Sequence, residues 1–211
     1  PINPNGHKTA YLWEDILQPN NILELIESFV HIRVESAKVY DATLGKIKTK
    51  KSEILIFPRF HQLKVVQRLK EAVVAEDVGH NYLIQHTTGS GKSLSIGWLA
   101  HLLTSLYKTP SDTKRMFDTV IVITDRRVLD RQIRQTIKQL EQVKGVVNAV
   151  DKNSQQLKEF LEDGKSLIIT TVQKFPVISE EIAKLKSKSF GVIIDEVHSS
   201  QSGETSKHLK K

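Results

Sequence analysis

The stretch that decides the fold runs from Tyr82 to Ser93 and reads YLIQHTTGSGKS. It begins with a short apolar run typical of a buried strand, and apolar residues follow it at helical spacing from Leu94 to Leu106. A glycine-rich turn between a strand and a helix lets backbone N–H groups surround a phosphate. The stretch therefore predicts a nucleotide phosphate-binding loop, with the positive end of the helix directed at the anion.

Within this loop, each residue type has a chemical reason to be present. Lysine can reach the β- and γ-phosphates, and a serine hydroxyl can bind Mg²⁺. The general motif starts with glycine, where this chain has His86. A chance GSGKS in a flexible linker is the alternative, and the flanking strand and helix argue against it. The expected nucleotide-binding residues are Thr88, Gly89, Ser90, Gly91, Lys92 and Ser93, with Ser93 also a Mg²⁺ ligand.

Outward from the loop, short apolar runs alternate with amphipathic stretches, which is typical of βαβ units. We expect an α/β fold of three layers, with a mostly parallel sheet and the ligand beyond the carboxyl ends of its strands. The helices expected between the strands centre on Leu102, Ile133, Leu157 and Ile182. The expected strands are residues 82–86, 119–124, 146–150, 166–171 and 190–195.

The front of the chain has a different texture. Asn21 is a candidate N-cap for one amphipathic helix, and residues 39–56 are interpreted as a linker or an edge hairpin. The basic run from Lys46 to Lys51 is interpreted as a mobile connector. We expect residues 1–56 to form a short helical and linker segment, and residues 57–211 to form the nucleotide-binding domain.

Composition narrows the class of protein. With 0 Cys, a disulfide scaffold is excluded, and a reducing compartment is the simplest location. No apolar stretch approaches the roughly 20 residues of a membrane-spanning helix, so no membrane partner is expected. A net charge of +7, from 31 Lys+Arg against 24 Asp+Glu, favours a polyanion such as nucleic acid. A solvated, lysine-rich face explains the same charge equally well.

A second candidate site follows the apolar run that starts at Phe190. Asp195 ends this run, and Glu196 comes next. A carboxylate at a strand end can hold Mg²⁺, and its neighbour can polarise an attacking water. The alternative is an exposed strand end without a catalytic role.

These motifs together resemble the superfamily 2 helicases and translocases. The match is Asp195-Glu196-Val197-His198, and FPRFHQ at residues 57–62 is similar to the adenine-reading Q motif. The resemblance implies a RecA-like P-loop domain in which Lys92, Asp195 and Glu196 are catalytic. Asp195 would also bind Mg²⁺, Glu196 would be the general base, and His198 would couple the site to other motifs. Gln62 would select ATP over GTP; alternatively, it simply begins a surface helix.

Within that superfamily, the chain most resembles the motor-bearing restriction subunit of type I restriction enzymes. HTTGSGKS, VITDRRVLDRQ at 122–132 and ITTVQKF at 169–175 carry this resemblance. It implies an ATP- and Mg²⁺-dependent translocase domain, the first RecA-like lobe, truncated after the DEVH motif. The parent enzyme would couple ATP hydrolysis to translocation and cleavage of double-stranded DNA, with a nuclease domain preceding the motor. Modification and specificity subunits in a bacterial or archaeal cytoplasm are implied as partners.

The two middle motifs follow expected strands, so they should lie on the same rim as the nucleotide. Hydroxyls and cations there can hold a sugar-phosphate backbone. Thr124 or Asp125 can alternatively cap the next helix. The expected DNA contacts are Thr124, Arg126, Arg127, Thr170, Thr171 and Lys174.

Two other functions remain open from the sequence. One is a different superfamily 2 ATPase, and the other is a nucleotide-binding P-loop module that does not act on DNA. We expect the isolated chain to bind ATP without efficient turnover, since such motors use an arginine from a second lobe.

Overall fold

The computed structural model describes residues 10, 12–41, 45–124, 127–151, 153–174, 185 and 187–195, without the side chains of residues 41 and 127–130. The chain divides into two compact units, Pro1–Phe60 and His61–Lys211. The division falls four residues beyond the boundary expected from sequence texture. Each unit is described by itself below.

The first unit begins with short helical turns, η1 (Leu12–Ile16), α1 (Pro19–Glu24) and η2 (Leu25–Phe29). The expected cap at Asn21 is wrong, because α1 starts at Pro19, whose fixed φ suits the first turn of a helix. The Asn21 amide instead donates to the Asp15 carbonyl at 2.7 Å. Leu25 and Phe29 are buried, as an amphipathic helix requires.

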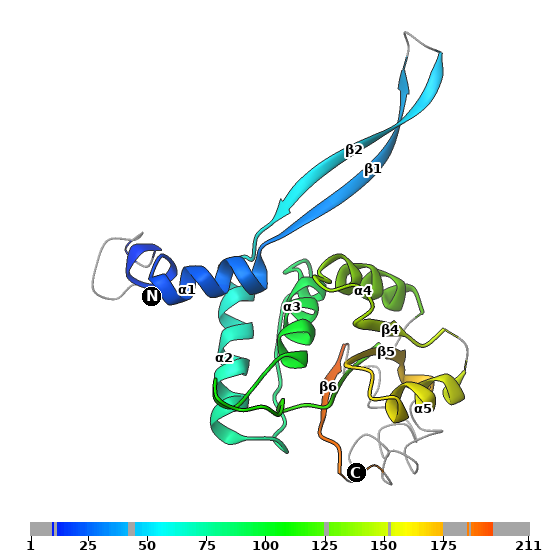
Figure 1. Cartoon of the computed structure of the whole chain (residues 1–211). Helices are drawn as coiled ribbons and strands as arrows, with labels where there is room; N and C mark the ends of the chain where they lie inside the picture. The colour runs from blue at the N-terminus through cyan, green and yellow to red at the C-terminus, as the bar shows by residue number, and fades with distance from the viewer. Residues whose placement is uncertain are drawn as a thin grey trace. The chain divides into compact units, whose positions relative to one another are not determined.

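A long antiparallel hairpin completes this unit. Strand β1 (His31–Asp41) pairs with β2 (Lys46–Ile56), from His31 opposite Ile56 to Asp41 opposite Lys46. Of the two interpretations of residues 39–56, the structure has the hairpin, and its first strand starts eight residues earlier than that range. The basic run therefore belongs to a regular strand (Figure 1).

The described part of the second unit contains a sheet of four parallel strands. They are β3 (Thr119–Thr124), β4 (Val147–Ala149), β5 (Leu167–Thr171) and β6 (Phe190–Ile194), in the order β4-β5-β3-β6. Thr124 lies opposite Thr171, and Ile123 opposite Ile194, so the central strands end almost level. The expected α/β fold with a parallel sheet is confirmed.

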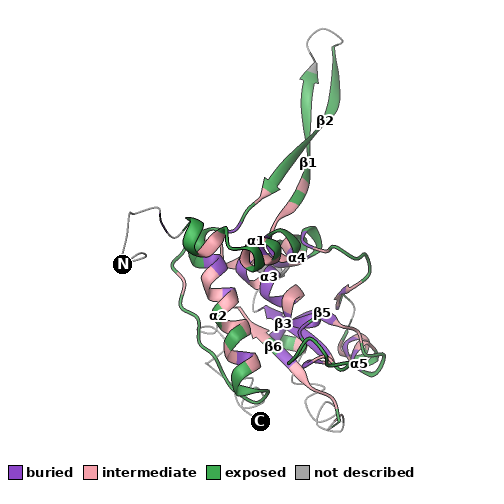
Figure 2. Ribbon diagram, turned by 60° about the vertical axis from the view of Figure 1, so that its left-hand side comes forward, coloured by how far each residue is buried: buried purple, intermediate pink, exposed green. Residues whose placement is uncertain are grey.

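Helices cover this sheet (Figure 1). Those that contact the strands are α3 (Lys92–Thr104), α4 (Arg127–Gln139) and α5 (Ser154–Glu162). Helix α2 (Phe60–Glu76) precedes them in the chain, and a short turn η3 (Val172–Lys174) follows β5. Leu157 and Leu161 of α5 pack in one core with Ile121 and Ile123 of β3. The alternate β3 side chains point to the other face, where α3 and α4 contact the sheet. Figure 2 shows the buried strands between these helices.

The first expected strand is absent. Residues 82–86 form no strand ladder, and the Leu83 side chain is 86% exposed. In the described sheet β6 is an edge strand, and no described segment pairs with its free edge. An apolar run signals the capacity for burial, but it does not say whether a ladder partner is in place. The helix expected around Ile182 lies outside the described residues.

Candidate functional site

The glycine-rich loop ends where α3 begins. Gly89 has φ +77° and Gly91 has φ +83°, left-handed conformations that favour glycine because they crowd a Cβ. Gly91 is the N-cap of α3, and its carbonyl accepts the first helical bond from Leu94 at 3.0 Å. The helix dipole adds partial positive charge at this end of α3, which favours an anion there.

Two side chains of α2 brace this loop. The Gln62 amide nitrogen donates to the Ser90 carbonyl at 3.3 Å and to the Gly91 carbonyl at 3.1 Å. His61 Nε2 lies 2.9 Å from the same Ser90 oxygen. The Gln62 side chain is only 2% exposed, so its two bonds form in a protected environment where they matter most.

His86, which stands where the general motif has glycine, packs against this brace. Its ring meets the His61 ring edge-on, with the centroids 5.6 Å apart. Burial, the His61 charge and the Lys92 charge together hold the pKa of His86 below its ordinary value. At neutral pH the imidazole of His86, at the start of the loop, is therefore uncharged.

The contacts of Arg115 show how α3 is oriented relative to the sheet. Arg115 Nη1 donates to the carbonyl of Thr104, the last residue of α3, at 3.0 Å and to Ser166 Oγ at 3.2 Å. Ser166 directly precedes β5, so the carboxyl end of α3 lies at the amino edge of the sheet. A 13-residue helix and a six-residue strand are each about 20 Å long. The loop that starts α3 is therefore directed to the carboxyl edge.

Asp195 lies at that same carboxyl edge. It directly follows β6, and its N–H donates to the Ile123 carbonyl of β3 at 3.0 Å. Its side chain is half-buried, as are Lys92 and Ser93 at the start of α3. The structure thus brings the loop motif and the strand-end carboxylate to one side of the sheet. Glu196 and His198 lie outside the described residues.

The sequence of this unit matches a known family. Residues 61–211 match the model of the SWI2/SNF2 ATPase family. The chain belongs to the SWI2/SNF2 ATPase family. This SWI2/SNF2 ATPase is also 28% identical over 208 residues to the type I restriction enzyme SauCOLORF180P endonuclease subunit of Staphylococcus aureus (strain COL). The match covers 95% of the chain and 21% of that relative.

Two further relatives come from distant organisms. The SWI2/SNF2 ATPase chain is 28% identical over 207 residues to the type I restriction enzyme HindI endonuclease subunit of Haemophilus influenzae, covering 93% of the chain and 18% of the relative. It is 25% identical over 221 residues to the putative MjaVIIIP endonuclease subunit of Methanocaldococcus jannaschii, covering 94% and 20%. The expected resemblance is confirmed. The chain spans about a fifth of the length of these relatives.

The threonines expected to contact DNA lie in the interior of the ATPase. Thr124, Thr170 and Thr171 are all buried, at the paired ends of β3 and β5. The Thr124 hydroxyl points to the Thr170 carbonyl at 3.5 Å. A DNA contact needs an exposed hydroxyl, and the structure gives these β-branched residues a strand-packing position instead.

Of the three cations expected to contact DNA, the structure describes the side chain of Lys174. Lys174 Nζ lies 2.5 Å from the Val150 carbonyl, which also accepts from Arg134 Nη2 at 3.1 Å. Arg134 in turn forms an ion pair with Asp151. Arg126 and the side chain of Arg127 lie outside the described residues. Lys174 therefore helps to hold the end of β4 to the region after β5.

Sequence reasoning missed His61, Arg115 and Arg134. Each acts through a main-chain carbonyl far away in sequence, and no local pattern marks such a partner. His61 was adjacent to a named candidate, Gln62, and its place in the first turn of α2 was the only available signal.

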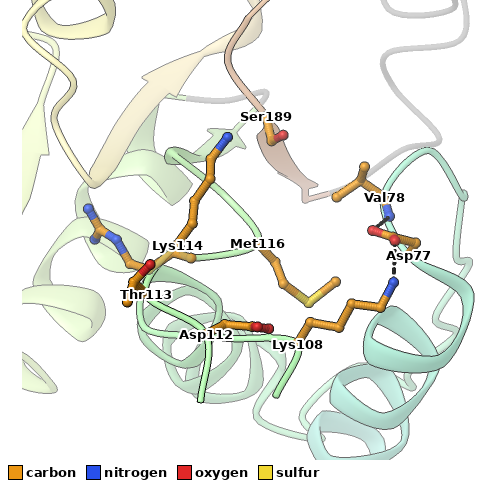
Figure 3. A pocket seen from close by; sticks show the side chains of 9 residues that line it. Asp77, Val78, Lys108, Asp112, Thr113, Lys114, Met116 and Ser189 are labelled. Atoms are coloured by element: carbon orange, nitrogen blue, oxygen red, sulfur yellow. Dashed lines mark hydrogen bonds and ion pairs between the residues drawn. The ribbon is translucent and has the colours of Figure 1, made fainter. Parts of the chain in front are cut away.

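A pocket of about 320 Å³ lies at the opposite edge of the sheet (Figure 3). Ser189, just before β6, and Met116, just before β3, line it. Lys108 bonds Asp77 there at 2.5 Å, and this bond holds the pKa of the Asp77 carboxyl below its ordinary value. Because the nucleotide motifs face the other edge, this pocket is no part of the candidate site.

The described residues contain no cluster of metal-ligating side chains and no membrane-spanning helix. No group of three or more His, Cys, Asp or Glu side chains there could hold a metal ion. None of the described helices is long and apolar enough to cross a membrane.

Proposed function

We propose that this chain is the ATP-binding lobe of a helicase-like motor that moves along double-stranded DNA in a type I restriction endonuclease subunit. One observation carries the proposal. A braced glycine loop and a strand-end aspartate lie on the same side of a parallel sheet, in a member of an ATPase family. Ligands bind at this edge in open α/β sheets.

The residues at this edge fit Mg·ATP. The left-handed Gly89 and Gly91 leave room for close approach of phosphate oxygens, with the N-terminal end of α3 behind them. A serine hydroxyl and a carboxylate are hard oxygen ligands of the kind that Mg²⁺ prefers. Ser93 and Asp195 would hold the ion, which would offset charge on the phosphates. Lys92 would bind the terminal phosphates, and Glu196 would take the proton of the attacking water.

Gln62 has a role in this proposal that differs from simple base recognition. An amide that reads adenine must face the ligand, whereas the Gln62 nitrogen is occupied by two loop carbonyls. Donation from this nitrogen to adenine would require the side chain to leave both bonds. We therefore propose that Gln62 couples occupancy of the base site to the shape of the phosphate loop.

The longer protein would supply the remaining activities. Its relatives are named as endonuclease subunits, which supports a multisubunit complex. Its partners there would be modification and specificity subunits in the cytoplasm. DNA cleavage and translocation would belong to that assembly. The cations Arg126, Arg127 and Lys174 stay candidate DNA contacts. The 211 residues alone would bind ATP without efficient turnover, because one lobe lacks the arginine supplied across the cleft in two-lobed motors.

Isothermal titration calorimetry with Mg·ATP and Mg·GTP tests the proposal. We expect the chain to bind ATP more tightly than GTP, and Lys92→Ala to abolish or strongly weaken binding. Lys114→Ala at the remote pocket is the matched control and should bind like the wild type. A folded chain that binds neither nucleotide, or a Lys92→Ala variant that binds like the wild type, would refute the assignment.

A further inference from the structure

The β1–β2 hairpin carries its positive charge in one half. The distal half, residues 37–41 and 46–50, contains four lysines and a single carboxylate, Asp41. The proximal half contains Arg33 and Lys51 against Glu35 and Glu53, so it is balanced. Arg33 bonds Glu35 at 2.5 Å. The net charge of the hairpin is therefore that of its distal half, which we call the lysine arm.

The strand register places cations on both faces of the arm. Lys46, Lys48 and Lys50 alternate along β2, so they share one face at a spacing of about 7 Å. Lys38 lies opposite Thr49, and directly opposed residues share a face. Because Thr49 alternates with the three lysines, Lys38 projects from the other face. All four lysines are exposed.

Among the described residues, no third strand and no packed face stabilises this hairpin. A two-stranded ribbon alone is marginally stable, and a third strand or a packed face usually completes it. Residues 35–40 and 46–55 are all exposed, and Figure 2 shows them in green on both strands. Tyr40 lies opposite Ile47 and Ile32 opposite Leu55, which holds the register but leaves these side chains in water. A partner that covers the arm would complete it.

We propose that the lysine arm binds double-stranded DNA by entering the major groove. That groove is about 12 Å wide and admits a two-stranded ribbon, and phosphates line both of its walls. Cations on both faces of a ribbon match two phosphate walls, whereas a flat acidic protein surface would engage one face. The exposed Tyr40–Ile47 pair sits among the lysines, where it would contact sugars or base edges. This inference rests on the proposed function, in which the motor acts on duplex DNA.

Fluorescence anisotropy of a labelled 20-base-pair duplex, over 50–300 mM salt, tests the arm. The test variant is the triple change Lys38→Gln, Lys46→Gln and Lys50→Gln. Each lost phosphate contact lowers the log–log salt slope by about 0.9, so we expect a fall of about 2.7. The charge-matched control is Lys114→Gln, Lys138→Gln and Lys144→Gln, three lysines of the second unit that are also exposed. It should leave the slope within about 1 of the wild type.

A second variant separates charge from folding. Arginine at the three arm positions keeps the cations, and we expect it to restore the wild-type slope. Circular dichroism and Mg·ATP titration should be the same for all variants. Duplex RNA should bind more weakly than DNA, because the A-form major groove is too narrow for side-chain entry.

Three outcomes would contradict the proposal that the lysine arm binds double-stranded DNA. They are a wild type that does not bind duplex DNA, an arm variant with the slope of the control, and equal, arm-dependent binding of duplex RNA. An arm variant that binds DNA normally while the hairpin mediates self-association would indicate a protein interface instead. A different result would contradict the proposed function alone. If a folded chain bound DNA through the arm but bound no nucleotide, the arm would still be a DNA-binding site, and the chain would not be an ATP-driven motor lobe.

Discussion

Alanine at Gly91 tests the packing of the phosphate loop, and alanine at Gly89 is its internal control. Both glycines have a similar left-handed φ, so either change should cost about 1–2 kcal/mol of strain. They differ in their surroundings. A Cβ on Gly91 would collide with the Gln62 amide nitrogen, whereas a Cβ on Gly89 would meet nothing within 4 Å.

The collision sets the size of the difference. Gln62 can move away only by giving up its bonds to two carbonyls, and each such bond contributes about 1 kcal/mol. Gly91→Ala should therefore destabilise the chain by about 1–2 kcal/mol more than Gly89→Ala does. Removing the obstacle with Gln62→Ala should abolish this excess, as a double-mutant cycle would show.

Urea unfolding, followed by circular dichroism, measures these free energies for the three single variants and for the two double variants that combine each glycine change with Gln62→Ala. Mg·ATP titration of the same proteins shows whether the loop still accepts phosphate, and we expect the greater loss for Gly91→Ala. Equal costs for the two glycine changes, with no dependence on Gln62, would show that α2 does not brace the loop and would refute the reasoning.

The remaining predictions concern the expected strand at residues 82–86, which the structure lacks, and the half-buried imidazole of His101. Leu83→Ala should change the free energy of unfolding by less than about 0.5 kcal/mol, because the side chain is exposed; a loss of 2 kcal/mol or more would place it in a core. Burial holds the pKa of His101 below its ordinary value of 6.5, while its Nε2 lies 2.8 Å from the Ile137 carbonyl. The unfolded chain then binds this proton at a higher pH than the folded chain does, so stability should drop as the pH falls from 7.5 to 5.5. Urea unfolding should show a smaller drop for His101→Gln, and an equal drop in both proteins would contradict this assignment.

Much of the fold was predictable because its signals are local. The strands at residues 119–124 and 166–171 are short apolar runs with β-branched residues, and the structure has strands there. The same kind of run at 82–86 predicted a strand that the structure lacks, because ladder bonds depend on a second segment. The hairpin was only one of two alternatives, since charged and apolar residues there alternate without a core to face.

The candidate site divides in the same way. The sequence by itself determined the chemistry available: glycines that tolerate left-handed φ, a lysine, a hydroxyl and a carboxylate after a strand. Tertiary structure alone decided that Gln62 faces the loop, that the threonines of β3 and β5 are buried, and that four lysines project from both faces of one ribbon. The physical reason is range: backbone preference and side-chain chemistry act within a few residues, whereas burial, hydrogen-bond partners and charge patterns depend on segments that only folding brings together.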